Sequence, residues 1–197
     1  LKREDYTQKD LYIQLIDYEA LDNNRFRIVN QMEIQGFELR IPDGILYING
    51  LPLVVFEFKS SIREDATMLD AYTQLTTRYK RDIPELFKYT ALCVISDGLD
   101  ARVGTVTAPS ERFMAWKTID GEREAGNVPE LETLARGVFD KARLLDIVRN
   151  FIVFERDGKD DAKFIKKVAA YHQYCAVNKA LSRTVTASRP DGDNRAG

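Results

Sequence analysis

Residues 42–59 constrain the fold more than any other part of this 197-residue chain. Their sequence is Pro-Asp-Gly-Ile-Leu-Tyr-Ile-Asn-Gly-Leu-Pro-Leu-Val-Val-Phe-Glu-Phe-Lys, two apolar runs separated by Asn49-Gly50. An Asn-Gly pair between two such runs predicts a β-hairpin, and the Val, Ile, Leu and Phe content places it in the core. Charged groups are costly in a core unless they are paired or bind something. Asp43, Glu57 and Lys59 are therefore candidate functional residues.

The length of the hairpin turn decides whether the two carboxylates can meet. A two-residue Asn49-Gly50 loop puts Asp43 on the face of the hairpin opposite to Glu57. A three-residue loop, with Gly50 in the left-handed conformation as a bulge, pairs Asp43 with Val55. Asp43 then lies on the same face as Glu57 and diagonal to it. We therefore expect an odd-length, bulged turn.

Two carboxylates this close predict a bound cation. They repel each other, so one must take up a proton or a cation must lie between them. Oxygen-only ligands select hard ions such as Mg²⁺ or Mn²⁺, which activate water and stabilise charge on a phosphoryl oxygen. Lys59 leaves the strand on the same face as Glu57 and would position that water or balance charge. The alternative is a solvated strand end, which is the usual setting of a Glu-x-Lys pair.

The rest of the chain predicts an α/β fold with a central mixed sheet flanked by helices, followed by a helical extension. The apolar run from Ala91 to Ser96 suits a strand that is buried on both faces. Asp65 is a plausible cap for the helix that follows the hairpin. We expect helices at residues 10–21, 67–80, 84–87, 130–138, 141–151 and 164–181, strands at 26–33, 37–41, 103–107 and 112–118, and a flexible tail from 182.

Composition limits the kinds of partner. The net charge of −2 provides no global basic field, so any nucleic-acid contact must come from a local patch. Cys93 and Cys175 lie far apart without metal-ligand spacing, which suggests free thiols in a cytoplasmic protein. No apolar run approaches a membrane span, and no signal peptide is present, so we expect no membrane association. A start at Leu1 and a polar end suggest a piece of a longer protein.

The pattern Pro42-Asp43 followed by Glu57-x-Lys59 resembles the core of the PD-(D/E)xK, restriction-endonuclease-like nucleases. The segments RIPDGILYINGLPLVVFEFK, YKRDIPELFKY, VISDG and RFMAWKTIDG resemble the nuclease domain of the motor (restriction, R) subunit of type I restriction enzymes, over roughly residues 24–155. The resemblance implies an endonuclease domain at residues 1–154 and the start of a helicase-like translocase domain at 164–197. The charged, glycine-containing residues 155–163 between them predict a linker.

The resemblance also implies a function. Asp43 and Glu57 would bind Mg²⁺ (or Mn²⁺), and Lys59 would complete the catalytic set for endonucleolytic cleavage of double-stranded DNA. In the full subunit, cleavage would follow ATP-driven translocation. The expected partners are DNA and the modification (methyltransferase) and specificity subunits.

The family's nuclease domains tend to carry a Gln-x-x-x-Tyr motif on the helix after the hairpin, near the DNA. Here Gln74 is followed by Tyr79, one residue too far, and Arg78 stands at the expected spacing. We predict Gln74 and Tyr79 as nucleic-acid contacts; the alternative for Gln74 is a solvent-facing helix position. Arg78, Lys80 and Arg81 lie on or beside this helix and are predicted phosphate contacts. The wider basic cluster adds Arg63 and Lys88.

The segment KVAAYHQYCAVNKAL resembles the helix that opens the translocase portion of these subunits. By that resemblance, Gln173 would contact the adenine of ATP in the full-length subunit. No G-x-x-x-x-G-K-[ST] loop follows, so this chain alone should not bind ATP productively. His172, the only histidine, is expected to pack or hydrogen-bond rather than bind metal.

Two rival functions remain open at this point. One is a non-catalytic module that docks the motor subunit or binds DNA; such a module would not need the ammonium group of Lys59. The other is a repair or recombination nuclease with the same fold, which the Gln173 segment disfavours. Related nucleases often supply a further acidic ligand from an N-terminal helix, and Glu19 is the candidate for that role here.

Overall fold

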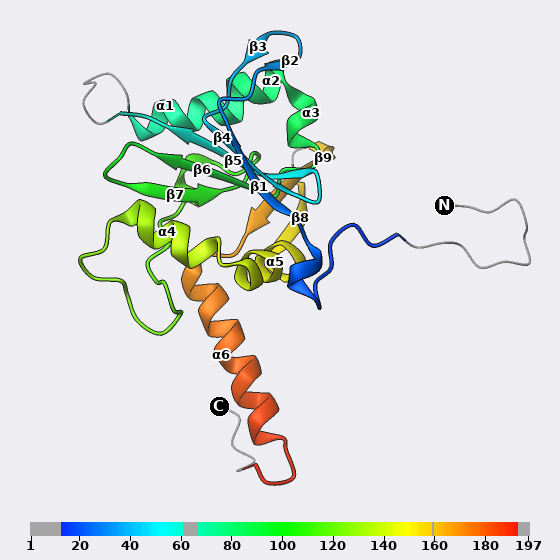
Figure 1. The fold of residues 1–197 in the computed structure, drawn as a ribbon, viewed down its shortest axis with the longest axis vertical. Helices are drawn as coiled ribbons and strands as arrows, with labels where there is room; N and C mark the ends of the chain where they lie inside the picture. Colours follow the sequence, from blue (N-terminus) through cyan, green and yellow to red (C-terminus); the bar gives the residue numbers. More distant parts are fainter. Residues whose placement is uncertain (1–12, 61–66, 159, 193–197) are drawn as a thin grey trace, which may run out of the picture.

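A mixed five-stranded sheet forms the centre of the computed structural model, which describes residues 13–60, 67–158 and 160–192 (Figure 1). The strand order is β1-β4-β5-β6-β7, with β5 and β6 parallel and the other neighbours antiparallel. The sheet confirms the predicted α/β class. Its strands are β1 (Phe26–Asn30), β4 (Gly44–Ile48), β5 (Leu51–Phe58), β6 (Leu92–Ser96) and β7 (Ala101–Gly104).

Helices cover both faces of the sheet. One face packs against α1 (Met68–Thr73), a π-helical turn η2 (Gln74–Tyr79), α2 (Lys80–Asp82) and α3 (Pro84–Phe87). The other packs against α4 (Glu130–Val138) and α5 (Lys141–Asn150). Strand alternation divides β5 between these two cores, so that Val54 joins the α4–α5 side and Val55 the α1–η2 side. Glu57, two residues after Val55, therefore faces α1 and η2.

The helix after the hairpin begins at a capping box. The Thr67 side chain accepts a hydrogen bond from the Asp70 backbone, and the Asp70 carboxylate accepts one from the Thr67 backbone. This confirms the helix predicted from residue 67, and Asp65, its predicted cap, lies outside the described residues. The helices predicted at 130–138 and 141–151 are confirmed as α4 and α5, the latter capped by Asp140.

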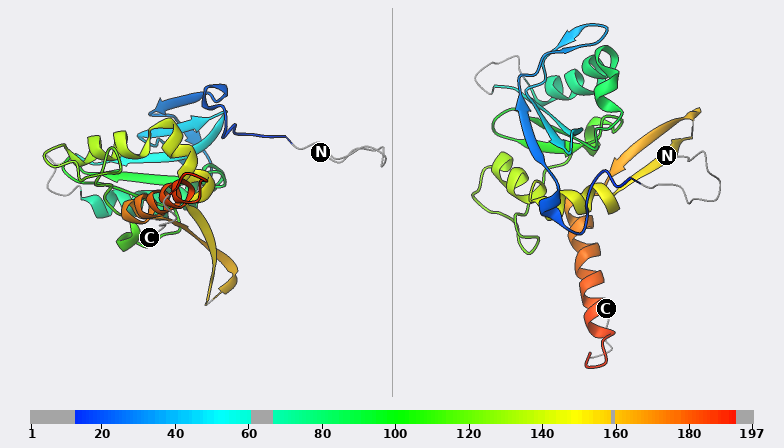
Figure 2. Two further views of the ribbon diagram at one scale, coloured as in Figure 1. Left: turned by 90° about the horizontal axis from the view of Figure 1, so that it is seen from below. Right: turned by 45° about the vertical axis from the view of Figure 1, so that its right-hand side comes forward.

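The predicted linker at residues 155–163 is wrong. It falls inside a β-hairpin of β8 (Ile152–Asp157) and β9 (Asp160–Val168), which extends from the body of the protein (Figure 2). Residues 164–168, expected to be helical, belong to β9, because their backbone pairs with β8. Two threonine side chains also bind the backbone of β9. The Lys166 N–H donates to Thr107 Oγ1 at 2.7 Å, and Thr105 Oγ1 donates to the Lys166 carbonyl at 2.6 Å. The final helix α6 (Tyr171–Ala187) projects away from the sheet and extends beyond the expected end at 181 (Figure 1).

Four further predictions of secondary structure are wrong in part. Residues 13–20 are not helical, because Asp17 Oδ1 accepts bonds from the Glu19 and Ala20 backbones and closes a turn, and only a short 3₁₀ helix η1 (Leu21–Asn23) follows. The first strand ends at Asn30 rather than 33. Residues 112–118 form no strand but two isolated bridges, from Met114 to Val103 and from Thr118 to Glu124, and a 3₁₀ helix η3 (Ser110–Arg112) overlaps their start. The expected strand at 37–41 is a small hairpin of β2 (Ile34–Gln35) and β3 (Leu39–Arg40).

Within the described part of the chain, no helix combines the length and apolar character that crossing a membrane requires.

Candidate active site

The hairpin turn contains two residues, so the predicted three-residue loop is wrong. Ile48 pairs directly with Leu51, and Asn49 and Gly50 between them have positive φ values of 52° and 87°. Two consecutive left-handed residues are the signature of a type I′ turn, which Asn-Gly favours. The extra residue lies further along β5, where the register shifts in a β-bulge beside Pro52. Proline lacks an N–H for the ladder, which suits it to a bulge.

The bulge brings the two carboxylates to one face. Beyond it, Gly44 pairs with Phe56, so the next position along the ladder sets Asp43 against Glu57. Asp43 Oδ2 accepts a hydrogen bond of 2.7 Å from the Phe58 backbone N–H. The expected shared face is therefore present, with Asp43 opposite Glu57 rather than diagonal to it. A bulge changes the parity of the register just as a longer turn would have done.

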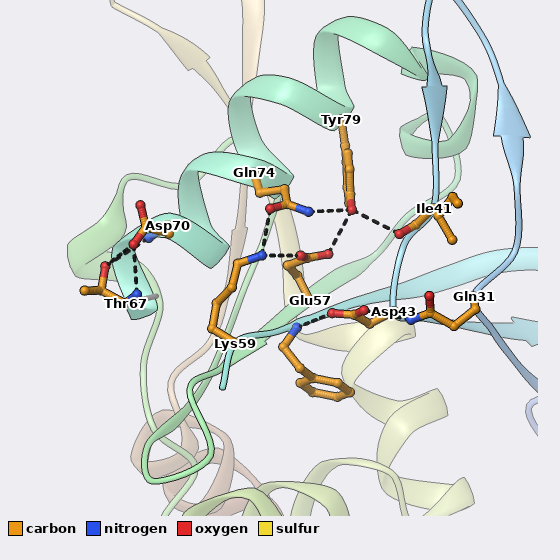
Figure 3. Close-up of polar contacts among 10 residues, drawn as sticks. Gln31, Ile41, Asp43, Glu57, Lys59, Thr67, Asp70, Gln74 and Tyr79 are labelled. Atoms are coloured by element: carbon orange, nitrogen blue, oxygen red, sulfur yellow. Dashed lines mark hydrogen bonds and ion pairs between the residues drawn. The ribbon is translucent and has the colours of Figure 1, made fainter. Parts of the chain in front are cut away.

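Glu57 is a buried carboxylate with two partners (Figure 3). It is 2% exposed; its Oε1 lies 2.7 Å from Lys59 Nζ, and its Oε2 accepts a bond of 3.1 Å from the Tyr79 hydroxyl. Burial raises the pKa of Glu57, and the negative charge of Asp43 raises it further, while the Lys59 and Tyr79 bonds act in the opposite direction. The carboxylate thus lies where a second positive charge would be favourable.

Four side chains close a ring of hydrogen bonds around this carboxylate (Figure 3). Lys59 Nζ also donates to Gln74 Oε1 at 2.7 Å, and Gln74 Nε2 donates to the Tyr79 hydroxyl at 2.7 Å. The Tyr79 hydroxyl completes the ring at Glu57 and also lies 3.2 Å from the Ile41 carbonyl. Gln74 is therefore half-buried and bonded to Lys59, which rules out the solvent-facing alternative.

The π-helical turn explains the irregular motif spacing. In an α-helix, two residues five apart point about 140° away from each other, because each residue turns the chain by about 100°. In the π-helical turn Gln74–Tyr79 the backbone hydrogen bonds link residues five apart, which brings these two side chains to one face. Tyr79, and not Arg78, consequently occupies the position beside Gln74, and Arg78 is exposed. Burial raises the pKa of Tyr79 well above its ordinary value, so the hydroxyl stays protonated.

The predicted basic residues differ in their surroundings. Arg78 and Lys80 are exposed on this helix. The Arg81 guanidinium is paired with the buried Asp82 at 2.6 Å, and Arg40 binds the same carboxylate at 2.6 Å. These bonds hold the pKa of Asp82 down to about 2. Arg40 thus ties β3 to the helix through Asp82, and Arg81 is paired with its neighbour rather than presenting a free charge. Lys88 is likewise paired, with Glu85, and Arg63 lies outside the described residues.

Two other sequence candidates lie elsewhere. Glu19 is exposed in the segment that hydrogen bonds through Asn24 to the Asn49 side chain, at the opposite end of the hairpin from Asp43. It cannot serve as the extra acidic ligand from there. Gln173 Oε1 accepts a hydrogen bond of 2.9 Å from the Ala170 backbone and so caps α6. Its predicted adenine contact in the full-length subunit stays a prediction.

Sequence reasoning missed one residue of the site. Gln31 Nε2 donates to Asp43 Oδ1 at 2.9 Å, from the position just after β1 (Figure 3). In an antiparallel pair, the residue after the end of one strand lies beside the residue before the start of the other. Pairing residues 26–30 with residues 44–48 in the sequence would therefore have placed Gln31 beside Asp43.

The site suits a hard divalent cation. Across residues 13–60, 67–158 and 160–192, no three His, Cys, Asp or Glu side chains gather as a metal cluster. The residues that could hold a cation at this site are the two carboxylates, Asp43 and Glu57. Mg²⁺ commonly binds through one or two carboxylates and completes its shell with water and substrate phosphate. Burial is the main cause of the raised pKa of Glu57, and a cation at this pair would relieve the further rise that the negative charge of Asp43 causes. The donor set therefore fits Mg²⁺ or Mn²⁺.

Comparison with known proteins gives the family. A family profile described as "Type I restriction enzyme R protein N terminus" matches residues 1–112. The chain is 45% identical to the type I restriction enzyme HindI endonuclease subunit of Haemophilus influenzae, over 99% of this chain and 19% of that protein. It is 30% identical to the putative MjaIXP endonuclease subunit of Methanocaldococcus jannaschii, over 93% of this chain and 19% of that protein. The chain thus spans about a fifth of the length of these relatives. It belongs to the family that forms the N-terminal region of type I restriction enzyme R proteins.

Proposed function

We propose that this chain is the nuclease domain of a type I restriction enzyme R subunit and that it hydrolyses phosphodiester bonds of double-stranded DNA with Mg²⁺ or Mn²⁺. The observation that carries the proposal is the pair of facing carboxylates, Asp43 and Glu57, with Lys59 held against Glu57 at 2.7 Å. The endonuclease-subunit names of the relatives support it.

Each residue has a distinct role in this proposal. When bound, the metal would lower the pKa of a coordinated water and stabilise charge on a phosphoryl oxygen. Asp43 and Glu57 supply the anionic oxygens, and the Phe58 backbone N–H orients the Asp43 carboxylate. Lys59 has three N–H donors, and among the described residues Glu57 and Gln74 accept two of them, which leaves a third that would bind a water or a phosphate oxygen.

The protonation of Glu57 sets a pH requirement for this chemistry. Its pKa lies above the ordinary 4.5, and only the deprotonated carboxylate binds a metal well. Metal binding must therefore release a proton whenever Glu57 is protonated, and metal affinity should fall as the pH decreases. Tyr79 limits this loss, because its hydrogen bond to Oε2 stabilises the charged form.

The activity of the whole enzyme involves more than these residues. Because the chain spans about a fifth of its relatives, we assign ATP-driven translocation to the full-length subunit. The same holds for assembly with modification and specificity subunits, and for the place of action, which we expect to be the cytoplasm. For DNA contacts, Gln74, Arg78 and Lys80 lie on the helix beside the site, and the latter two are exposed.

A substitution of Lys59 tests the proposal. Full-length subunit with Lys59→Ala should assemble and hydrolyse ATP normally but cleave plasmid DNA about 10²–10³-fold more slowly, the usual loss for a group that stabilises transition-state charge. Lys88→Ala is the matched control, because Lys88 is an exposed lysine that is also paired with a glutamate. Wild-type cleavage by the Lys59 variant, with assembly intact, would favour a docking module instead.

A further inference from the structure

Gln31 has an unusual backbone conformation beside the carboxylate pair. Among the described residues other than glycine, only Gln31 and Asn49 have a positive φ, 51° and 52° respectively. Asparagine adopts this left-handed region readily, whereas a longer side chain such as glutamine does so at a cost. Backbone strain of this kind persists where the surroundings require it, and often at functional sites. Gln31 therefore needs an explanation beyond turn formation.

The Gln31 side chain fixes one oxygen of Asp43. Its Nε2 donates to Asp43 Oδ1 at 2.9 Å, and the Phe58 backbone N–H donates to Oδ2 at 2.7 Å. The Gln31 backbone N–H also donates to the Asp43 carbonyl, at 3.3 Å. Each carboxylate oxygen thus has one donor that limits its rotation, and each keeps lone-pair capacity for a further partner.

We propose that Gln31 is a positioning residue that holds the Asp43 carboxylate in the orientation in which it binds the metal. The inference rests on the proposed function. Hydrogen bonds from second-layer groups orient metal ligands in this way, and their loss typically reduces metal affinity 10–100-fold. A purely structural role does not explain why a glutamine occupies this strained position, because Gln31 is exposed and its backbone hydrogen bond needs no side chain.

A glycine substitution separates the two roles. Glycine adopts a φ of 51° without strain but has no amide. In Mn²⁺ titrations of this chain, monitored by electron paramagnetic resonance, Gln31→Gly should raise the apparent Kd for Mn²⁺ 10–100-fold. Its thermal stability should equal or exceed that of the wild type. Cleavage by the full-length variant should be impaired most at limiting metal and recover as Mn²⁺ is increased.

Asn49→Gly is the matched control, since Asn49 has the same backbone conformation at the other end of the hairpin. Its side chain accepts a bond from the Arg25 backbone and donates to the Leu15 carbonyl. Loss of these bonds should lower the thermal stability and leave Mn²⁺ affinity unchanged. Opposite effects of the two glycine variants would support the positioning role.

Asp43→Asn in the same titration distinguishes the possible failures. If it binds Mn²⁺ as well as the wild type, the metal site is wrong and the proposed function fails with it. If Asp43→Asn loses Mn²⁺ binding while Gln31→Gly keeps it, only the role of Gln31 is overturned. Should Gln31→Gly not fold, Gln31→Asn replaces it as the test. Asparagine tolerates the left-handed conformation, but its side chain is one methylene too short to bring the amide to Asp43 Oδ1. This variant should weaken Mn²⁺ binding too, and unchanged affinity there would overturn the inference.

Discussion

The hydroxyl of Tyr79 offers a quantitative test of the hydrogen-bonded ring. Tyr79 is 3% exposed, and its hydroxyl accepts a bond from Gln74 while its one proton lies between Glu57 Oε2 and the Ile41 carbonyl. Tyr79→Phe removes the hydroxyl and keeps the ring in the core. The substitution therefore changes the polar network without a large change in packing.

The cost follows from the bonds that are lost. The hydroxyl makes one bond to a charged carboxylate, worth about 1.5–3 kcal/mol, and accepts one from a neutral amide, worth about 1 kcal/mol. The free energy of unfolding should fall by about 2–4 kcal/mol in total. For a chain of this size that corresponds to a decrease in Tm of about 5–15 °C.

The same substitution should change the pH dependence of cleavage. The bond from Tyr79 lowers the pKa of Glu57, so its removal raises that pKa further. The acidic limb of the pH–rate profile for DNA cleavage should then move to higher pH. Thermal unfolding of this chain and cleavage rates of the assembled enzyme across a pH series measure the two effects separately.

Tyr72→Phe is the control on the same helical face. The Tyr72 hydroxyl donates one bond of 3.0 Å to the Ala108 carbonyl, away from the carboxylates. Its loss should cost about 1 kcal/mol and leave the pH profile unchanged. Equal destabilisation by the two variants, together with an unshifted profile for Tyr79→Phe, would refute the role of the ring.

Three further outcomes follow from the structure. Burial raises the pKa of Glu57 above 4.5, so the folded chain binds more protons than the unfolded chain in the pH range just above that value. Its stability to urea without metal should therefore fall as the pH rises through this range. Glu57→Gln should abolish this dependence of stability on pH. Gly36→Ala would place a Cβ 2.2 Å from the Asp82 carbonyl oxygen, so the free energy of unfolding should fall by about 1–3 kcal/mol, measured as a lower Tm. An unchanged Tm would mean that the β2–β3 hairpin moves freely. Burial raises the pKa of Cys93 to about 12, so a thiol reagent should modify Cys175 in the native chain and Cys93 only after unfolding.

Local sequence patterns predicted much of the core correctly. The continuous apolar run that forms β6 indicated a strand buried on both faces, and all five of its residues are buried. The helical periodicity of residues 130–138 and 141–151 predicted α4 and α5 within one residue. These elements follow their patterns because their burial is uniform: β6 is covered on both faces, and α4 and α5 each pack one apolar face against the sheet.

The pattern failed where polar residues alternate without a clear apolar face. Residues 155–163 are charged and contain glycine, which indicated a linker, yet they lie in the β8–β9 hairpin. Pairing between two strands stabilises such a segment through backbone bonds that its side chains do not reveal. Residues 13–20 differ for a related reason, because the Asp17 carboxylate stabilises a turn instead of a helix.

The sequence by itself determined which chemical groups form the candidate site and roughly where they lie: Asp43 before one strand, Glu57 and Lys59 at the end of the next, and Gln74 on the following helix. Only the tertiary structure decided whether they meet. The β-bulge beside Pro52 changes which face Asp43 occupies, and the π-helical turn brings Tyr79 to Gln74. Strand and helix periods are local properties, but the place where one extra residue is accommodated depends on how the neighbouring elements pack.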